Sequence, residues 1–296
     1  MGPAISGVAG NNGYNIAFEA YGDPTDPAVL LINGLGSQMI GYRVDFCETL
    51  VEAGFCAIRY DNRDVGLSTK TTGEAPVLHR IRDDIRAGRP VNVAYDVADM
   101  AGDGIAVLDA VGVDRAHVFG MSMGGMIVQT MGYTCPHRLL SITSVMSSTG
   151  NRKVGVSTPE TAEMLVKPRP PDIEGAIAMD VEERRMEAGR WFDEAEVEAY
   201  VRAQYDRCHH PDGVAFQYAA IVADGDRTER LGTITTPMTV IHGDMDPLIT
   251  RSGGEATAAA VPNAKLVMVE GMGHHLPPET WPICIEELKQ LAALTT

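Results

Sequence analysis

The sequence predicts an α/β fold, with a mostly parallel, doubly wound sheet and an inserted helical cap. Short apolar segments alternate with helix-like segments over residues 28–146, and this alternation resumes at residue 237. Strands that alternate with helices are typical of parallel sheets, whose strands are buried on both faces. Residues 150–225 contain no long apolar strand and are punctuated by prolines. We therefore expect a core of residues 1–149 and 226–296 around a cap of residues 150–225.

Composition favours a soluble enzyme over a nucleic-acid-binding or membrane protein. The 296 residues include 40 acidic and 24 basic side chains, a formal net charge of −16, and 45% are hydrophobic. This charge repels phosphate backbones and anionic membrane surfaces. The N-terminal segment lacks the basic and apolar regions of a signal peptide, and no apolar run reaches the roughly 18 residues of a membrane span. We expect a cytoplasmic protein without nucleic-acid or membrane partners.

The cysteines indicate neither a disulfide framework nor a metal centre. They are odd in number, scattered, and without C-x-x-C spacing: Cys47, Cys56, Cys135, Cys208 and Cys284. Such a pattern is typical of buried thiols. The sequence therefore predicts chemistry without a metal or another cofactor.

The core elements follow in order. Apolar or alternating runs predict strands at residues 14–21, 28–32, 55–60, 139–146, 237–241 and 265–269. Apolar residues at helical spacing predict helices at residues 42–53 and 77–85, after Asp96 as an N-cap, and from about Trp281. Within the cap, the clearest helical pattern runs from Asp193 to Cys208.

Two loops in the first half of the chain are predicted to have different roles. The apolar run 28–32 ends in Asn33-Gly34-Leu35-Gly36-Ser37, where glycines allow a turn with amide groups facing a cleft at the strand's carboxyl end. An oxyanion hole belongs at such a place. The charged segment 61–68 follows the next strand, and we expect it to brace its loop rather than to react.

Residues 116–129 are the most informative stretch. A short apolar strand precedes Gly120-x-Ser122-x-Gly124, and helix-forming residues follow it. Small residues two before and two after the serine let strand and helix pack closely while the serine backbone is strained. The sequence therefore predicts a nucleophile elbow that exposes the Ser122 hydroxyl.

A serine hydroxyl needs a base within hydrogen-bond reach and a carboxylate that orients the base. Asp246 and His274 each follow a predicted strand, in the order Ser, Asp, His. Asp244 competes with Asp246, and the proline after Asp246 favours the latter. His275 competes with His274, and the Gly-x-Gly before His274 favours His274 because it lets the loop approach the elbow.

These motifs resemble those of the α/β-hydrolase superfamily over nearly the whole chain: Asn33-Gly34-Leu35-Gly36, Asp61-x-Arg63-Asp64-x-Gly66-x-Ser68, Gly120-Met121-Ser122-Met123-Gly124-Gly125, Gly243-Asp244-x-Asp246-Pro247 and Gly271-Met272-Gly273-His274. The resemblance implies a catalytic triad of Ser122, Asp246 and His274. It also implies an oxyanion hole formed by the amides of Leu35 and Met123. Asn33 departs from the family, since many relatives have histidine there.

Within that superfamily the chain is similar to capped esterases such as aclacinomycin methylesterase, and more closely to serine-dependent macrolide esterases. The resemblance implies a small-molecule ester as partner and the opening of a macrolactone ring, a function in antibiotic resistance. The alternatives are a methylesterase or general carboxylesterase of other bulky esters, and a cofactor-free perhydrolase of the haloperoxidase type. A binding protein without turnover is disfavoured by the intact triad, and Ser122 at the elbow excludes a dehalogenase with a carboxylate nucleophile.

Overall fold

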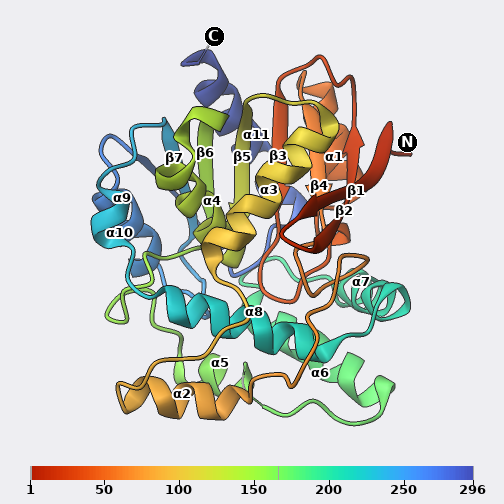
Figure 1. Cartoon of the computed structure of the whole chain (residues 1–296), viewed down its shortest axis with the longest axis vertical. Coiled ribbons are helices and arrows are strands. Elements are labelled where there is room, and N and C mark those ends of the chain that lie inside the picture. Colours follow the sequence, from red (N-terminus) through yellow and green to blue (C-terminus); the bar gives the residue numbers. More distant parts are fainter. Residues whose placement is uncertain (1, 166, 296) are drawn as a thin grey trace.

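The computed structural model describes residues 2–165 and 167–295, without the side chains of Arg82 and Arg86. Within these residues one eight-stranded sheet has the order β1-β2-β4-β3-β5-β6-β7-β8. β1 pairs with β2 and β2 with β4 in antiparallel orientation, and the remaining pairs are parallel. The predicted fold class is confirmed (Figure 1). The strands are β1 (Ile5–Asn11), β2 (Tyr14–Tyr21), β3 (Ala28–Ile32), β4 (Cys56–Tyr60), β5 (Ala116–Met121), β6 (Leu139–Val145), β7 (Met238–Gly243) and β8 (Lys265–Val269).

Helices cover both faces of this sheet. α3 (Val97–Val111), α4 (Met123–Thr134) and α10 (Ser252–Ala260) pack on one face, and α1 (Val44–Glu52) and α11 (Trp281–Ala293) pack on the other. Asp96 caps α3 as expected, because its carboxylate accepts the Asp99 N–H and the Asp99 side chain accepts the Asp96 N–H. Short helices connect other elements: α9 (Thr228–Leu231) and the 3₁₀ turns η1 (Met39–Gly41), η2 (Pro136–Arg138) and η3 (Pro278–Thr280).

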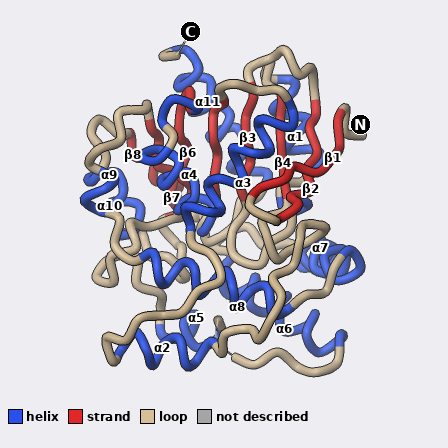
Figure 2. Tube along the Cα trace, viewed as in Figure 1, coloured by secondary structure: helices blue, strands red, loops and turns tan. Residues whose placement is uncertain are grey.

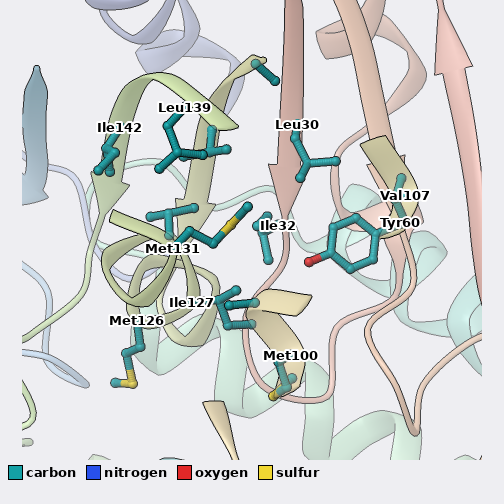
Figure 3. Close-up of a cluster of buried hydrophobic side chains, with 14 of the residues drawn as sticks. Leu30, Ile32, Tyr60, Met100, Val107, Met126, Ile127, Met131, Leu139 and Ile142 are labelled. Atoms are coloured by element: carbon teal, nitrogen blue, oxygen red, sulfur yellow. The ribbon is translucent and has the colours of Figure 1, made fainter. Parts of the chain in front are cut away.

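The hydrophobic core has one layer on each side of the sheet. Alternate residues of a strand point to opposite faces, so Leu30 and Ile32 of β3 join one layer while Val29 and Leu31 join the other. In Figure 3, side chains of α4 such as Ile127 lie against the first layer, in a cluster that includes Tyr60, Met100, Val107, Met131, Leu139 and Ile142. This packing holds the strand before the elbow and the helix after it.

A helical region is inserted between β6 and β7. It contains α5 (Pro159–Met164), α6 (Ile173–Glu187), α7 (Glu194–Arg207) and α8 (Pro211–Asp224), and α2 (Leu78–Arg86) from the first half of the chain lies beside α8. Figures 1 and 2 show these helices together beyond one end of the sheet, the end where the parallel strands finish. The helical region therefore covers the carboxyl edge of the core.

The N-terminal strand is the main element that we did not predict. β1 and β2 form a hairpin in which Asn11 pairs with Tyr14. Asn12 and Gly13 both have positive φ angles, 46° and 85°, as a two-residue type I′ turn requires. The Asn-Gly dipeptide between two extended segments was the available signal.

None of the helices in the described ranges is both long and apolar enough to cross a membrane.

Candidate active site

Ser122 occupies a sharp turn between β5 and α4. Its backbone angles, φ 54° and ψ −114°, are strained for a residue with a side chain. Two contacts hold this conformation: the Ser122 N–H donates to the Val145 carbonyl at 2.9 Å, and the Ser147 hydroxyl donates to the Ser122 carbonyl at 2.8 Å. A Cβ atom at Gly120 would lie 2.1 Å from the Gly124 carbonyl oxygen, so the close approach of strand and helix requires glycine. The predicted elbow geometry is present.

Asp246 and His274 come together at the same edge of the sheet. Asp246 follows β7 and His274 follows β8, and 2.7 Å separates Asp246 Oδ2 from His274 Nδ1. Since a carboxylate only accepts hydrogen bonds, Nδ1 carries the proton and Nε2 is left as the basic nitrogen. The N–H groups of Leu248 and Ile249 both donate to Asp246 Oδ1 at 2.9 Å, which fixes the carboxylate. Ser122 and His274 line one cavity.

Two opposing effects act on the pKa of His274. Burial lowers this pKa, but the charge of Asp246 and its hydrogen bond raise it, and the net result is a pKa above the ordinary histidine value. The imidazolium that would form during proton transfer is therefore stabilised by Asp246.

The two competing residues lie elsewhere. Asp244 is exposed, and its carboxylate accepts the Gly271 N–H at 2.7 Å, which braces the loop before His274. His275 Nε2 lies 2.6 Å from the Trp191 carbonyl of the helical region. Asp244 and His275 thus have structural contacts of their own, and neither takes part in the Asp246–His274 pair.

The two amides expected to form an oxyanion hole come from different elements. Leu35 lies in the loop after β3, and Met123 is the first residue of α4. The first N–H groups of a helix have no acceptor within it, and their dipoles favour negative charge. A Cβ atom at Gly34 would lie 3.2 Å from Ser122 Cβ, so the Leu35 loop is in contact with the elbow.

Asn33 and Gly36 show how that loop is held. The Asn62 side chain donates to the Asn33 carbonyl at 3.1 Å, and Gln217 of α8 accepts the Gly36 N–H at 2.8 Å. The Asn33 carboxamide is buried and has no hydrogen-bond partner among the described residues. The side chains of Asn62 and Gln217 therefore hold the main chain of this loop.

The charged segment after β4 braces loops, as expected. Asp61 accepts the N–H groups of Met39 at 2.7 Å and Leu67 at 2.8 Å. It also forms an ion pair with Arg207 of α7, with 2.7 Å between Nη2 and Oδ2. The Asp61 carboxylate therefore connects the core to the helical region, and its contacts are structural rather than catalytic.

The segment after α6 docks directly on the loop that carries His274. The Glu187 carbonyl accepts the His274 N–H at 2.6 Å, and the Gly271 carbonyl accepts the Arg190 N–H at 2.7 Å. Gly189 lies between them with φ 69°, and a Cβ atom there would lie 2.6 Å from the Gly271 oxygen. The helical region thus contacts the candidate base through its main chain.

A sequence profile described as "alpha/beta hydrolase fold" matches residues 27–279. The chain belongs to this family. It is 29% identical over 281 residues to rhodomycin D methylesterase of Streptomyces peucetius, with 88% of each chain covered. It is 24% identical to 3-oxoadipate enol-lactonase 1 of Acinetobacter baylyi, over 84% of this chain and 82% of that one. The structure of a thermophilic esterase from Thermogutta terrifontis superposes with a TM-score of 0.73 at 21% identity, covering 98% and 100% of the two chains.

In this α/β-hydrolase chain a large cavity separates the core from the helical region. Its volume is about 1120 Å³, just above the roughly 300–1,000 Å³ that is typical of small-molecule sites. Both the core and the helical region contribute apolar and polar side chains to its walls. The lining includes Leu35, Met121, Met146, Glu187, Trp191 and Tyr200. The cavity has room for a bulky substrate.

Sequence reasoning did not identify the cap residues that wall this cavity. The docking segment 187–191 begins at the last residue of the acid-rich helix α6, whose composition indicates only a solvated helix face. The local signal in this segment is Gly189, which follows a helical pattern, but glycine follows so many helices that it does not indicate docking. His209 lies after α7 and stacks on Tyr205 with ring centroids 4.8 Å apart. Over residues 2–165 and 167–295, no group of three or more His, Cys, Asp or Glu side chains is placed to hold a metal ion.

Proposed function

We propose that this protein is a serine hydrolase of carboxylic esters that works through an acyl-enzyme. The observation that carries the proposal is the pairing of a strained Ser122 elbow with a 2.7 Å Asp246–His274 contact on the wall of one cavity. This combination supplies a nucleophile, a base and a carboxylate that orients the base.

The reaction would proceed in two halves. His274 Nε2 takes the Ser122 hydroxyl proton as Oγ attacks the ester carbonyl, and it then gives this proton to the departing alkoxide. In the second half water attacks the acyl-enzyme and loses a proton to His274, which passes it to Ser122 Oγ as the bond to the acyl carbon breaks and the carboxylic acid leaves. The amides of Leu35 and Met123 would donate to the oxyanion of each tetrahedral intermediate, which is typically the largest single contribution in acyl transfer.

We further propose a methyl or other simple alkyl ester of a bulky acid as substrate. The cavity volume of about 1120 Å³ supports a bulky acyl group. The relative with 29% identity is named for methylester hydrolysis, and the enol-lactonase shows that similar chains also open lactones. These names favour the methylesterase alternative over macrolactone opening, which stays a prediction from the resemblance alone.

Mass spectrometry of reaction products tests the assignment. Methyl esters of polycyclic aromatic acids, an enol-lactone and a panel of macrolides are each incubated with the protein. We expect the methyl esters to lose the methyl group as methanol and the macrolides to remain intact. A macrolide that gains one water without losing a sugar would establish ring opening and overturn the methyl-ester assignment. If every compound remains unchanged, the ester hydrolase proposal itself is wrong.

A further inference from the structure

The Glu187 carboxylate stands out among the acidic groups of the cavity. Glu187 ends α6, its carbonyl accepts the His274 N–H at 2.6 Å, and its side chain lines the cavity. Within the described residues, this carboxylate has neither a hydrogen-bond donor nor a cation at ion-pair distance. An unpaired carboxylate therefore lies directly beside the candidate base.

The other acids in the same helical wall already have partners; Asp193, for example, accepts the Glu196 N–H at 3.0 Å as the N-cap of α7. Asp180 pairs with Arg169 at 2.9 Å, and Glu183 pairs with the same guanidinium. Glu196 pairs with Arg43. Glu279 also lines the cavity, but this side chain is exposed to solvent. Glu187 is half-buried, and removing a carboxylate from water without a partner costs free energy, so Glu187 is the cavity acid for which a ligand cation would matter most.

Neither of the cationic side chains Arg184 and Lys167 neutralises the Glu187 carboxylate by an ion pair. Arg184 lies one turn earlier on α6, and its guanidinium lies over the Tyr200 ring, 4.8 Å from the centroid. Lys167 is exposed to solvent at the cavity's edge. Arg184 is therefore held against an aromatic ring, and Lys167 is exposed to solvent.

The ionisation of the Glu187 carboxyl group depends on its burial and on the charges beside it. Burial raises its pKa to about 7, and nearby charges modify this effect: His274 and Arg184 lower the pKa, while Glu183 and Asp246 raise it. At neutral pH the free carboxyl group is thus near half-protonation. A permanent cation bound beside it would favour the charged form.

We propose that Glu187 forms a subsite for an alkylammonium group of the substrate, so that the enzyme prefers esters that carry a positive charge close to the scissile carbonyl. This inference rests on the proposed ester hydrolase function and adds a substrate class to it. The formal net charge of −16 acts in the same direction, because it attracts cationic substrates to the protein.

Matched ester pairs test the subsite. Choline esters are compared with 3,3-dimethylbutyl esters of the same acid, and methyl 4-(trimethylammonio)butanoate with methyl 5,5-dimethylhexanoate. Each pair has the same shape and differs in charge. We expect the parent to prefer the cationic member of at least one pair by roughly tenfold in kcat/KM, as for a partly desolvated charge pair. Glu187→Gln should abolish this preference.

Glu182→Gln is the matched control. Glu182 is an exposed residue of the same helix, outside the cavity, and its substitution changes the net charge equally. We expect this variant to keep the preference of the parent. The parent's preference should also rise several-fold between about pH 6 and about pH 8, as Glu187 ionises, and stay flat in Glu187→Gln. Effects of pH on His274 cancel in this ratio because both esters share them.

Three results would overturn the inference. Equal turnover of both members of every pair by the parent removes the subsite but leaves the ester hydrolase. A Glu187→Gln variant that loses activity equally on cationic and neutral esters, with a shifted pH profile, shows that Glu187 acts through His274. Failure of the parent to cleave any ester removes the proposed function, and calorimetric binding of the same pairs to Ser122→Ala then tests the subsite independently, with equal affinity counting against it.

Discussion

A helix of the core and a helix of the helical region differ in how many of their side chains are buried. In the core helix α4, every residue from Met123 to Gly132 is buried, and Arg63 forms a fully buried ion pair with Asp103. In α7 of the helical region Val201 alone is buried among fourteen residues. The core helix α4 is thus held by packing, and α7 by surface contacts, whereas α8 buries Phe216 and Ala220 against the core.

The difference indicates that the core positions the reacting groups and the helical region selects the substrate. Reaction chemistry needs atoms positioned to a fraction of an ångström, and a densely packed core provides this because its residues have few alternative positions. Substrate selection tolerates more variation, so it can be placed on helices with many exposed side chains. The two regions meet at residues 187–191, where the main chain of one supports the candidate base of the other.

Removal of the Ser122 hydroxyl should have the largest effect. We expect Ser122→Ala to lower kcat on the order of 10⁶-fold while the circular dichroism spectrum is unchanged, since losing a triad nucleophile costs about this much. A fluorophosphonate should label the parent on Ser122. Ser6→Ala, at an exposed position of β1, serves as a control with parental activity. Activity of Ser122→Ala within tenfold of the parent would exclude the assigned nucleophile.

Asp246→Asn should lower kcat by about 10⁴-fold, because the imidazole loses the carboxylate that orients it. Asp244→Asn should stay within about tenfold of the parent, since the Asp244 carboxylate accepts a hydrogen bond from the Gly271 main chain and not from His274. Asp246 raises the pKa of His274, and the base must be neutral to act. Removing this charge lowers that pKa, so the acidic limb of the kcat/KM profile should move to lower pH. An unmoved limb would contradict the electrostatic role.

Arg63→Met tests the buried pairing of the core. Asp103 would remain with no exposed side-chain surface and without its cation, which typically costs about 3–5 kcal/mol in the free energy of unfolding. Urea denaturation measures this value. Restoring stability by the double variant Arg63→Met with Asp103→Leu would show that the penalty comes from the uncompensated charge, whereas no recovery would assign it to lost packing.

Gly189→Ala tests the junction between the two regions. A Cβ atom would meet the Gly271 oxygen at 2.6 Å, so the loop with His274 must shift. We expect kcat to fall by about 10²-fold, the cost of an ångström-scale misplacement. Gly225→Ala is the control, because Gly225 also has positive φ, 65°, but nothing lies near its would-be Cβ. Equal effects of both variants would indicate backbone strain rather than displacement of the base.

Arg202→Ala should have the smallest effect. Arg202 joins Glu174 and Glu198 on the surface of the helical region, with all three side chains largely exposed. Exposed ion pairs contribute little, because water screens them and side-chain ordering opposes them. The thermal midpoint should remain close to that of the parent. A large decrease would show that surface pairing holds the helical region together, contrary to its contrast with the core.

Much of the core could be predicted because its signals are local. A run such as residues 28–32 has to be buried on both faces, and the glycines around Ser122 suit no common structure better than a tight turn from strand to helix. Asp246 and His274 could be named because parallel strands end at one edge, which brings loops far apart in sequence together. The hairpin of β1 also had a local signal, Asn12-Gly13, which we did not use.

Tertiary structure alone decided the contacts of the helical region. The Glu187 carbonyl reaches the His274 amide across 87 residues, and His275 contacts the Trp191 carbonyl from 84 residues away. No periodicity or spacing encodes such contacts, since they depend on how whole helices pack over the edge of the sheet. The sequence by itself determined the fold class and the chemistry of the candidate triad through local patterns and strand order. The walls of the cavity, and with them the unpaired Glu187, follow from non-local packing.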